Sequence, residues 1–211
     1  FHWDRSSTRD EDRTCWIRVA QSWASASWGA MFIPRVGQEV VVEFLEGNPD
    51  RPLITGVVYN ANNHVPYKLP DNKTRSTIKS NSSPGGSGFN ELRFEDKAGE
   101  EEIYLHAERD WHRDVKHDEI GKIDNDRDIK ITGGNDTLTI SSGNHTITVS
   151  AGKSEVTAAQ SITLSVGPNS IKIDTTGVTI NGMKVDVQAS ATMSLQAGAT
   201  LSVTGAMISL N

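Results

Sequence analysis

Aliphatic residues recur in pairs throughout residues 129–211, and the two members of each pair are separated by one residue. A spacing of two is the period of a β-strand that buries one face. Residues that favour turns lie between many of the pairs, as in segments 133–135, 142–144 and 167–169. The second members advance by about eight residues on average, so the pattern predicts a tandem array of short strands. The pairs are Ile129/Ile131, Leu138/Ile140, Ile147/Val149, Ile162/Leu164, Ile171/Ile173, Val178/Ile180, Val185/Val187, Met193/Leu195, Leu201/Val203 and Ile208/Leu210.

A repeat of about eight residues is too short to enclose a core in one chain. Eight extended residues span roughly 26 Å, which accommodates one strand and a corner, whereas a single-chain β-helix needs several strands per coil. Burying two aliphatic side chains contributes roughly 3–6 kcal/mol, but ordering eight residues costs on the order of 10 kcal/mol. Three chains, each supplying one side of a triangular prism, close the perimeter and leave no free edge. We therefore predict an obligate homotrimer. Its representative core residues are Ile131, Ile140, Val149, Leu164, Ile173, Ile180, Val187, Leu195 and Val203.

Two other interpretations of residues 129–211 fit the pattern less well. A disordered tail would be poor in β-branched apolar residues, and this segment has them at regular intervals. A monomeric sandwich built from hairpins also suits regularly spaced strands. Sandwich cores use large residues, however, and the segment contains no aromatic side chain, while 41 of its 83 residues are Ser, Thr, Gly or Ala. The intertwined trimer is therefore favoured over the sandwich.

The first part of the chain predicts short strands at 16–20, 40–45 and 53–59, with a loop at 46–52. Several short strands within about 60 residues suggest a small barrel, for which the OB-fold is the commonest form. The predicted fold is thus all-β, an OB-fold-like barrel followed by an intertwined triple-stranded β-helix. The predicted domains are an OB-like collar at 1–65, a neck with short strands at 66–105, and a needle at 106–211.

Composition narrows the classes of function. All 13 aromatic residues lie within the first 111 positions, which marks a change of architecture along the chain. The net charge of −6 gives no basic footprint for nucleic acid. No apolar run reaches the length of a transmembrane helix, and nothing resembles a signal peptide. The chain opens at Phe1 and has its first methionine at Met31, so we expect its natural N-terminus to lie upstream.

Residues that could carry chemistry do not combine into a recognisable site. The histidines at 106, 112 and 117 lie among carboxylates, but their spacing fits neither a helix nor a strand, so a solvated charged neck is favoured over a metal site. The glycine-rich run 85–88 lacks the residues and the helix of a phosphate loop. The tryptophans fit barrel packing better than a sugar platform, and the single cysteine, Cys15, is interpreted as a small buried hydrophobe. We predict no catalytic residue, no cofactor and no metal.

Six ordered strings are distributed along residues 1–110 and make up about half of them. They resemble the VgrG spike proteins of bacterial type VI secretion, which are related to contractile phage tail spikes. The strings are FHWDR (1–5), CWIRVAQ (15–21), WGAMFIPRVGQEV (28–40), GNPDRP (47–52), GGSGFNELRFED (85–96) and GEEEIYLHA (99–107). The resemblance implies an OB-like collar, a neck and a trimeric β-prism that tapers to a tip. It also implies a large base region preceding Phe1 that would contact the secreted tube protein.

The resemblance further implies a mechanical function, the puncturing of a target envelope when a contractile sheath drives the spike outward. The protein would assemble in the bacterial cytoplasm, without a signal peptide, and then be translocated into the target cell. The implied partners are a cone-shaped protein that caps the tip and effectors carried near it, with no nucleic acid. We expect Met207, Ile208, Ser209 and Leu210 to form the docking surface for the cone protein.

Two alternative functions fit the sequence less well. A phage-like tail fibre or adhesin that binds envelope glycans would share the prism, but it would need aromatic side chains or paired carboxylates on it. Residues 129–211 contain no aromatic and only four acidic residues, which disfavours this alternative. An effector enzyme fused to the spike would need a further domain after Asn211.

Overall fold

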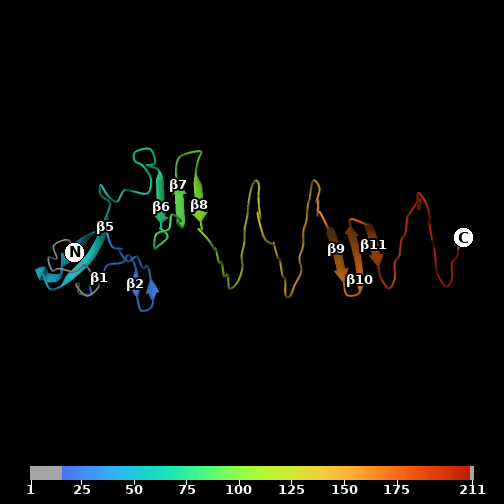
Figure 1. Cartoon of the computed structure of the whole chain (residues 1–211), viewed down its shortest axis with the longest axis horizontal. Coiled ribbons are helices and arrows are strands. Elements are labelled where there is room, and N and C mark those ends of the chain that lie inside the picture. Colours follow the sequence, from blue (N-terminus) through green and yellow to red (C-terminus); the bar gives the residue numbers. More distant parts are fainter. Residues whose placement is uncertain (1–15, 210–211) are drawn as a thin grey trace. The chain divides into compact units, whose positions relative to one another are not determined.

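The computed structural model describes residues 16–209. The chain divides into two units, residues 1–124 and residues 125–211, and each is described by itself. Within the described residues nearly all regular structure is β, in short strands joined by turns and extended segments (Figure 1). No helix in this part of the chain is long and apolar enough to cross a membrane.

The first unit begins with a three-stranded sheet. Its order is β1 (Arg18–Val19), β5 (Pro52–Val58) and β4 (Glu39–Phe44), with β1 parallel and β4 antiparallel to β5. These strands lie where the apolar runs predicted them. A short 3₁₀ turn at Leu45–Gly47 leads from β4 into the predicted loop 46–52. The Gly, Asn and Pro residues of this loop favour turns over strand pairing.

A small hairpin separates β1 from β4. It consists of β2 (Ala24–Ser25) and β3 (Trp28–Gly29), which are antiparallel. Gly29 has a φ of +138°, and a Cβ there would lie 2.4 Å from the carbonyl oxygen of Trp23. Only glycine allows the two backbones to approach so closely at this point.

A second sheet in the first unit has the order β6 (Arg75–Lys79), β7 (Glu91–Glu95) and β8 (Glu102–His106). Both pairings are antiparallel and free of bulges. Residues alternate between the two faces of each strand, so one face carries charged and polar side chains and the other carries aliphatic and aromatic ones. The strands span residues 75–106, of which all but His106 fall in the segment 66–105 predicted as the neck, and we call this sheet the neck sheet.

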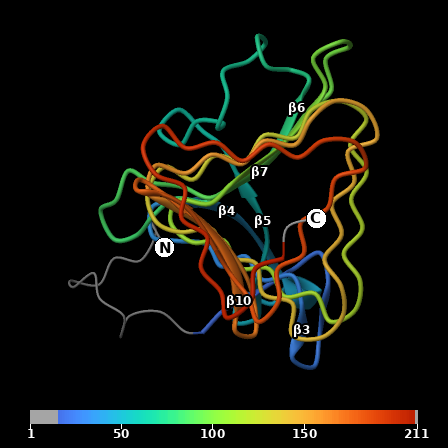
Figure 2. The same cartoon turned by 90° about the vertical axis from the view of Figure 1, so that its right-hand side faces the viewer.

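Over its described residues, 125–209, the second unit contains one sheet, formed by β9 (Ser161–Val166), β10 (Asn169–Asp174) and β11 (Gly177–Asn181). The three strands form an antiparallel meander in which each pairs with the next along the chain. They lie side by side in Figure 1 and overlap at the β10 label in Figure 2. The segment 167–169, expected from the sequence as a corner between repeats, is thus part of a hairpin turn. We call β9–β11 the hairpin block.

The hairpin block separates two regular arrays of aliphatic pairs. Before it, the pairs 129/131, 138/140 and 147/149 are nine residues apart, and after it the pairs 185/187, 193/195 and 201/203 are eight residues apart. Among the described residues of the second unit, these flanking arrays have no strand partner within the chain. Their period-two pattern is therefore that of strands whose ladders must be completed by other chains.

No hydrophobic side chain among the described residues is buried in the single chain, and the one buried polar residue is Glu91. The chain exposes 20348 Å² of surface. A compact monomer of its mass, 23.0 kDa, exposes about 9,600 Å² by the usual scaling of surface with mass. An excess of this size, together with the many exposed aliphatic side chains, indicates surface that other chains cover.

Candidate subunit interface

All nine residues predicted to form the trimer core are exposed in the single chain. In the first array the predicted core position is the better covered member of its pair. Ile140 is 43% exposed against 69% for Leu138, and Ile131 is 46% exposed against 61% for Ile129. The second member of each pair is therefore the less exposed one even before another chain is present, although both members share one face of the strand.

The array after the hairpin block shows the opposite order. In each of the pairs 185/187, 193/195 and 201/203 the first member is the less exposed one. The second members, Val187, Leu195 and Val203, are predicted from the sequence as core residues, and in the single chain these are the more exposed members. Both members of these pairs contribute to the apolar surface of the chain.

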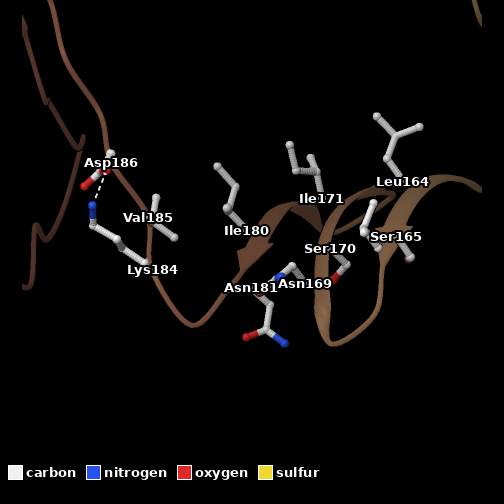
Figure 3. A pocket seen from close by; sticks show the side chains of 12 residues that line it. Leu164, Ser165, Asn169, Ser170, Ile171, Ile180, Asn181, Lys184, Val185 and Asp186 are labelled. Atoms are coloured by element: carbon white, nitrogen blue, oxygen red, sulfur yellow. Dashed lines mark hydrogen bonds and ion pairs between the residues drawn. The ribbon is translucent and has the colours of Figure 1, made fainter.

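The hairpin block concentrates its aliphatic side chains on one face. Leu164, Ile171 and Ile180 are cross-strand partners, and their side chains lie on the same side of the sheet in Figure 3. They line an open hollow together with Val185. Ile173 and its two partners form the next row. This face, which includes three of the predicted core residues, has no covering element within the described chain.

The neck sheet also has an open apolar face. Ile78, Leu92 and Leu105 are cross-strand partners in one row, and Phe94 pairs with Ile103 in the next. All of these except Leu92 are exposed in the single chain. A monomeric protein turns such a face inward, so its exposure here indicates a surface that other copies of the chain cover.

The opposite face of the neck sheet holds a buried carboxylate. The side chain of Glu91 is 1% exposed. Its carboxylate accepts hydrogen bonds from Tyr67 Oη at 2.5 Å and Thr77 Oγ1 at 2.8 Å, and Lys79 Nζ lies 3.7 Å away. Burial by itself raises the pKa of Glu91, but these hydrogen bonds and the charges of Lys79 and Arg93 together lower it. The carboxylate is therefore charged and fully engaged.

Arg93 extends this network across the sheet. Its guanidinium donates to Tyr67 Oη at 3.1 Å and to a carboxylate oxygen of Glu102 at 2.7 Å. It also lies 4.3 Å from the centre of the Tyr104 ring, a cation–π geometry. The hydrogen bonds to Tyr67 and Glu102 raise the pKa of Arg93. These contacts hold the segment around Tyr67 against the polar face of the sheet.

A second carboxylate on the same face pairs with the edge strand. Glu95 accepts hydrogen bonds from Thr74 Oγ1 at 2.5 Å and Arg75 Nε at 2.7 Å. These bonds lower the pKa of Glu95 to about 2. Both carboxylates of β7 are thus held ionised by structural partners, and neither has the raised pKa of a general acid.

Sequence reasoning treated the neck as a connection and did not find this network. The signal was present in β7, where Glu91, Arg93 and Glu95 alternate with Leu92 and Phe94. An alternating strand of this kind predicts a sheet with two unlike faces. What the pattern does not reveal is that the charged face is the one covered within the chain.

The three histidines weighed as metal ligands do not come together. The ring of His106 stacks on Phe89 at 4.4 Å between centroids, and its Nδ1 lies 3.0 Å from the Phe89 carbonyl oxygen. His117 pairs with the adjacent Asp118 at 3.0 Å, and His112 is exposed. Within residues 16–209 no group of three or more His, Cys, Asp or Glu side chains is arranged to hold a metal ion.

The remaining candidates have structural placements or lie outside the described residues. The glycine-rich run 85–88 belongs to the connection between β6 and β7, which the hydrogen bond from Ser82 N to the Gly88 carbonyl oxygen closes at 2.8 Å. Trp23 and Trp28 pack edge to face across the β2–β3 hairpin at 5.0 Å. Cys15 and Trp3 lie outside the described residues.

The predicted tip surface is partly described. Met207 is 87% exposed, and Ile208 and Ser209 are also exposed. Leu210 lies outside the described residues. The exposed methionine and isoleucine are chemically suited to an apolar contact, since methionine adapts its shape to a partner surface.

Two family models match the chain. Residues 76–195, more than half of the chain, match the bacteriophage T4 gp5 C-terminal trimerisation domain. Residues 4–59 match the type VI secretion system/phage-baseplate injector OB domain. The first match covers the neck sheet, the first array and the hairpin block, and the second covers the sheet of β1, β5 and β4.

Curated relatives agree with these family models. The type VI secretion system spike protein VgrG4b of Pseudomonas aeruginosa is 54% identical over 127 residues, which cover 60% of this chain and 16% of the relative. VgrG1a of the same organism is 58% identical over 120 residues, covering 56% of this chain and 19% of the relative. The actin cross-linking toxin VgrG1 of Vibrio cholerae is 46% identical over 131 residues, which cover 62% of this chain and 12% of the relative.

The chain spans about a sixth of the length of VgrG4b. The all-β architecture of the described residues agrees with both matched domains. These findings show that the chain belongs to the family of the bacteriophage T4 gp5 C-terminal trimerisation domain, as a VgrG spike of the type VI secretion system.

Proposed function

We propose that three copies of this chain form the collar, neck and needle of a spike that punctures a target envelope at the tip of a contractile secretion apparatus. The observation that carries this proposal is the uncovered aliphatic surface of the single chain, which follows the neck sheet, both arrays and the hairpin block. Three identical chains around a common axis bury this surface with one repeated contact. The match to a trimerisation domain supports the number three.

The proposed role is mechanical. Strands completed by neighbouring chains leave no lateral edge and no hinge, so the trimer resists bending. Chains that wind around each other separate only by unwinding together, which makes unfolding slow. The carboxylates on the covered face of the neck sheet are engaged in ion pairs and hydrogen bonds, which supports a structural protein and not an enzyme.

The proposed partners follow from the family. The tube protein would contact a base region preceding this segment, a cone-shaped protein would cap the tip, and effectors would travel with the spike. The collar, neck and needle would occupy residues 1–65, 66–105 and 106–211. We further propose assembly in the bacterial cytoplasm followed by translocation into the target cell.

The oligomeric state tests the proposal directly. Light scattering coupled to size-exclusion chromatography is expected to give a mass of about three times 23.0 kDa, independent of dilution over the micromolar range. The physical reason is that one chain exposes about twice the surface of a folded monomer. A well-folded species at the mass of one chain would overturn both the trimer and the puncturing role.

Removal of the last repeat tests the tip. Deleting residues 201–211 removes the exposed Met207, Ile208 and Ser209 and is expected to abolish binding of the cone protein, measured by titration calorimetry. The trimer should persist, because the neck sheet, the first array and the hairpin block are untouched. Undiminished binding by the shortened trimer would place the docking surface elsewhere.

A further inference from the structure

The hairpin block differs from the rest of the needle in one structural respect. Among the described residues of the second unit, only β9, β10 and β11 complete hydrogen-bonded ladders within a single chain. The flanking arrays have the same alternating pattern but no partner strand in the chain. The block can therefore begin to form in one chain, whereas the arrays require strands from other chains.

The first turn of the block favours a hairpin. Gly167 and Pro168 form a two-residue loop between Val166 and Asn169, which are cross-strand partners. Gly167 has a φ of +54°, and Pro168 has its φ restricted by its ring. A glycine with positive φ at the first position of a two-residue loop is the arrangement of type II′ hairpins.

The second turn and the exit from the block are also closed locally. Asp174 Oδ1 accepts hydrogen bonds from Thr176 N at 2.8 Å and Thr176 Oγ1 at 2.6 Å. Asn169 Oδ1 accepts a bond from Met183 N at 3.1 Å, which ties the segment after β11 to the start of β10. All these contacts join residues close in sequence, so their loop-closure entropy is small.

The spacing of the aliphatic pairs gives the block a further property. In the array after the block the pairs repeat every eight residues, so a chain displaced by eight residues still places aliphatic residues against aliphatic residues. Within the block the interval changes from nine residues, between 162 and 171, to seven, between 171 and 178. Because these two intervals are unequal, a chain displaced along the block no longer places aliphatic residues against aliphatic residues.

We propose that the hairpin block is the nucleus on which three chains begin to assemble, through contact of its apolar face with the same face of two further copies. This inference rests on the trimer proposed above. The two rows of aliphatic side chains supply the contact, and the free outer edges of β9 and β11 remain open to strands of other chains. The flanking arrays then pair outward from a register that the block has already set.

Two glycines provide a matched test. Gly167 lies in the first turn of the block, and Gly152 lies in the extended segment before it. Both have positive φ, +54° and +104°, and a Cβ would meet nothing within 4 Å at either position. Alanine therefore strains the backbone of the native chain at both sites without a clash. Only the strain at Gly167 falls within the proposed nucleus.

The experiment follows trimer formation by light scattering after the full chain is diluted from guanidinium chloride. Gly167→Ala is expected to slow assembly at least tenfold and to change the unfolding rate little, because its turn is formed in the transition state. Gly152→Ala is expected to leave assembly within twofold of the unmodified chain and to speed unfolding instead. Equal slowing by both variants, or faster unfolding of both with unchanged assembly, would overturn the nucleus.

The experiment distinguishes a failure of the nucleation proposal from a failure of the proposed function. If the unmodified chain is a folded monomer, the trimer is wrong and no assembly rate exists to compare. If it is a trimer and the two glycine variants behave alike, the trimer stands and only the nucleation by the hairpin block is refuted.

Discussion

Replacing Ile140 with aspartate is expected to prevent the trimer from forming. Ile140 is the more sheltered member of its pair in the single chain, and threefold symmetry brings three copies of the residue toward one axis. Each variant chain loses about 2 kcal/mol of aliphatic burial and places an unpaired carboxylate in the core, which costs several kcal/mol more. Size-exclusion chromatography with light scattering should show loss of the species at three times the chain mass.

The neighbouring residue supplies the control for this variant. Thr139 lies between Leu138 and Ile140, so its side chain points to the opposite face of the strand. Thr139→Asp introduces the same charge one residue away and is expected to retain the trimer, with a change in stability below about 1 kcal/mol. A stable Ile140→Asp trimer, or equal loss in both variants, would show that the aliphatic stripe does not face the axis.

The period of two predicted strands at the positions of β9, β10 and β11, but it did not predict that these strands pair with one another within one chain. A strand in a hairpin and a strand completed by another chain have the same alternating pattern. The segment at 167–169 favours a turn in either case, and the pairing of Val166 with Asn169, which shows a hairpin, is visible only in the structure. The local pairing of β9–β11 therefore could not be predicted from the same pattern that predicted the array.

The neck shows a different limit of sequence reasoning. Alternation in β7 predicts a two-faced sheet, and the usual expectation is that its apolar face points inward. Here the face covered within the chain is the one that carries Glu91 and Arg93. The apolar face remains open with Ile78 and Phe94 exposed. A single sequence predicts which residues share a face, but which face is covered depends on the number of chains in the assembly.

The candidate chemical residues show the difference between contacts that are local in the sequence and contacts that are not. Spacing alone indicated that the histidines at 106, 112 and 117 do not fit one strand or helix, and the structure places His106 on Phe89 and His117 beside Asp118. The buried network around Glu91 was missed because it joins Tyr67 to β7 over 24 residues. Contacts between residues so far apart in the sequence come from the fold and leave no local sequence pattern.

Replacing Glu91 with alanine is expected to open the neck sheet. The carboxylate is the shared acceptor for Tyr67 and Thr77 and lies 3.7 Å from Lys79 Nζ. Removing one member of a buried charged network leaves the others without compensation and costs about 3–5 kcal/mol. Amide hydrogen exchange of residues 75–106 should accelerate by about two to three and a half orders of magnitude, since each 1.4 kcal/mol of opening free energy changes the exchange rate about tenfold.

Two further variants separate the charge from the fold. Glu91→Gln keeps the shape and one acceptor oxygen, so it should accelerate exchange less than Glu91→Ala does. Glu46→Ala removes a carboxylate whose pairing with Arg51 is solvent-exposed, and such pairs contribute below about 1 kcal/mol. If Glu91→Ala leaves the exchange of β6–β8 as slow as Glu46→Ala does, the neck is held together by its apolar face alone. In that case the stability of the neck would come from contacts between chains and not from the charged network within each one.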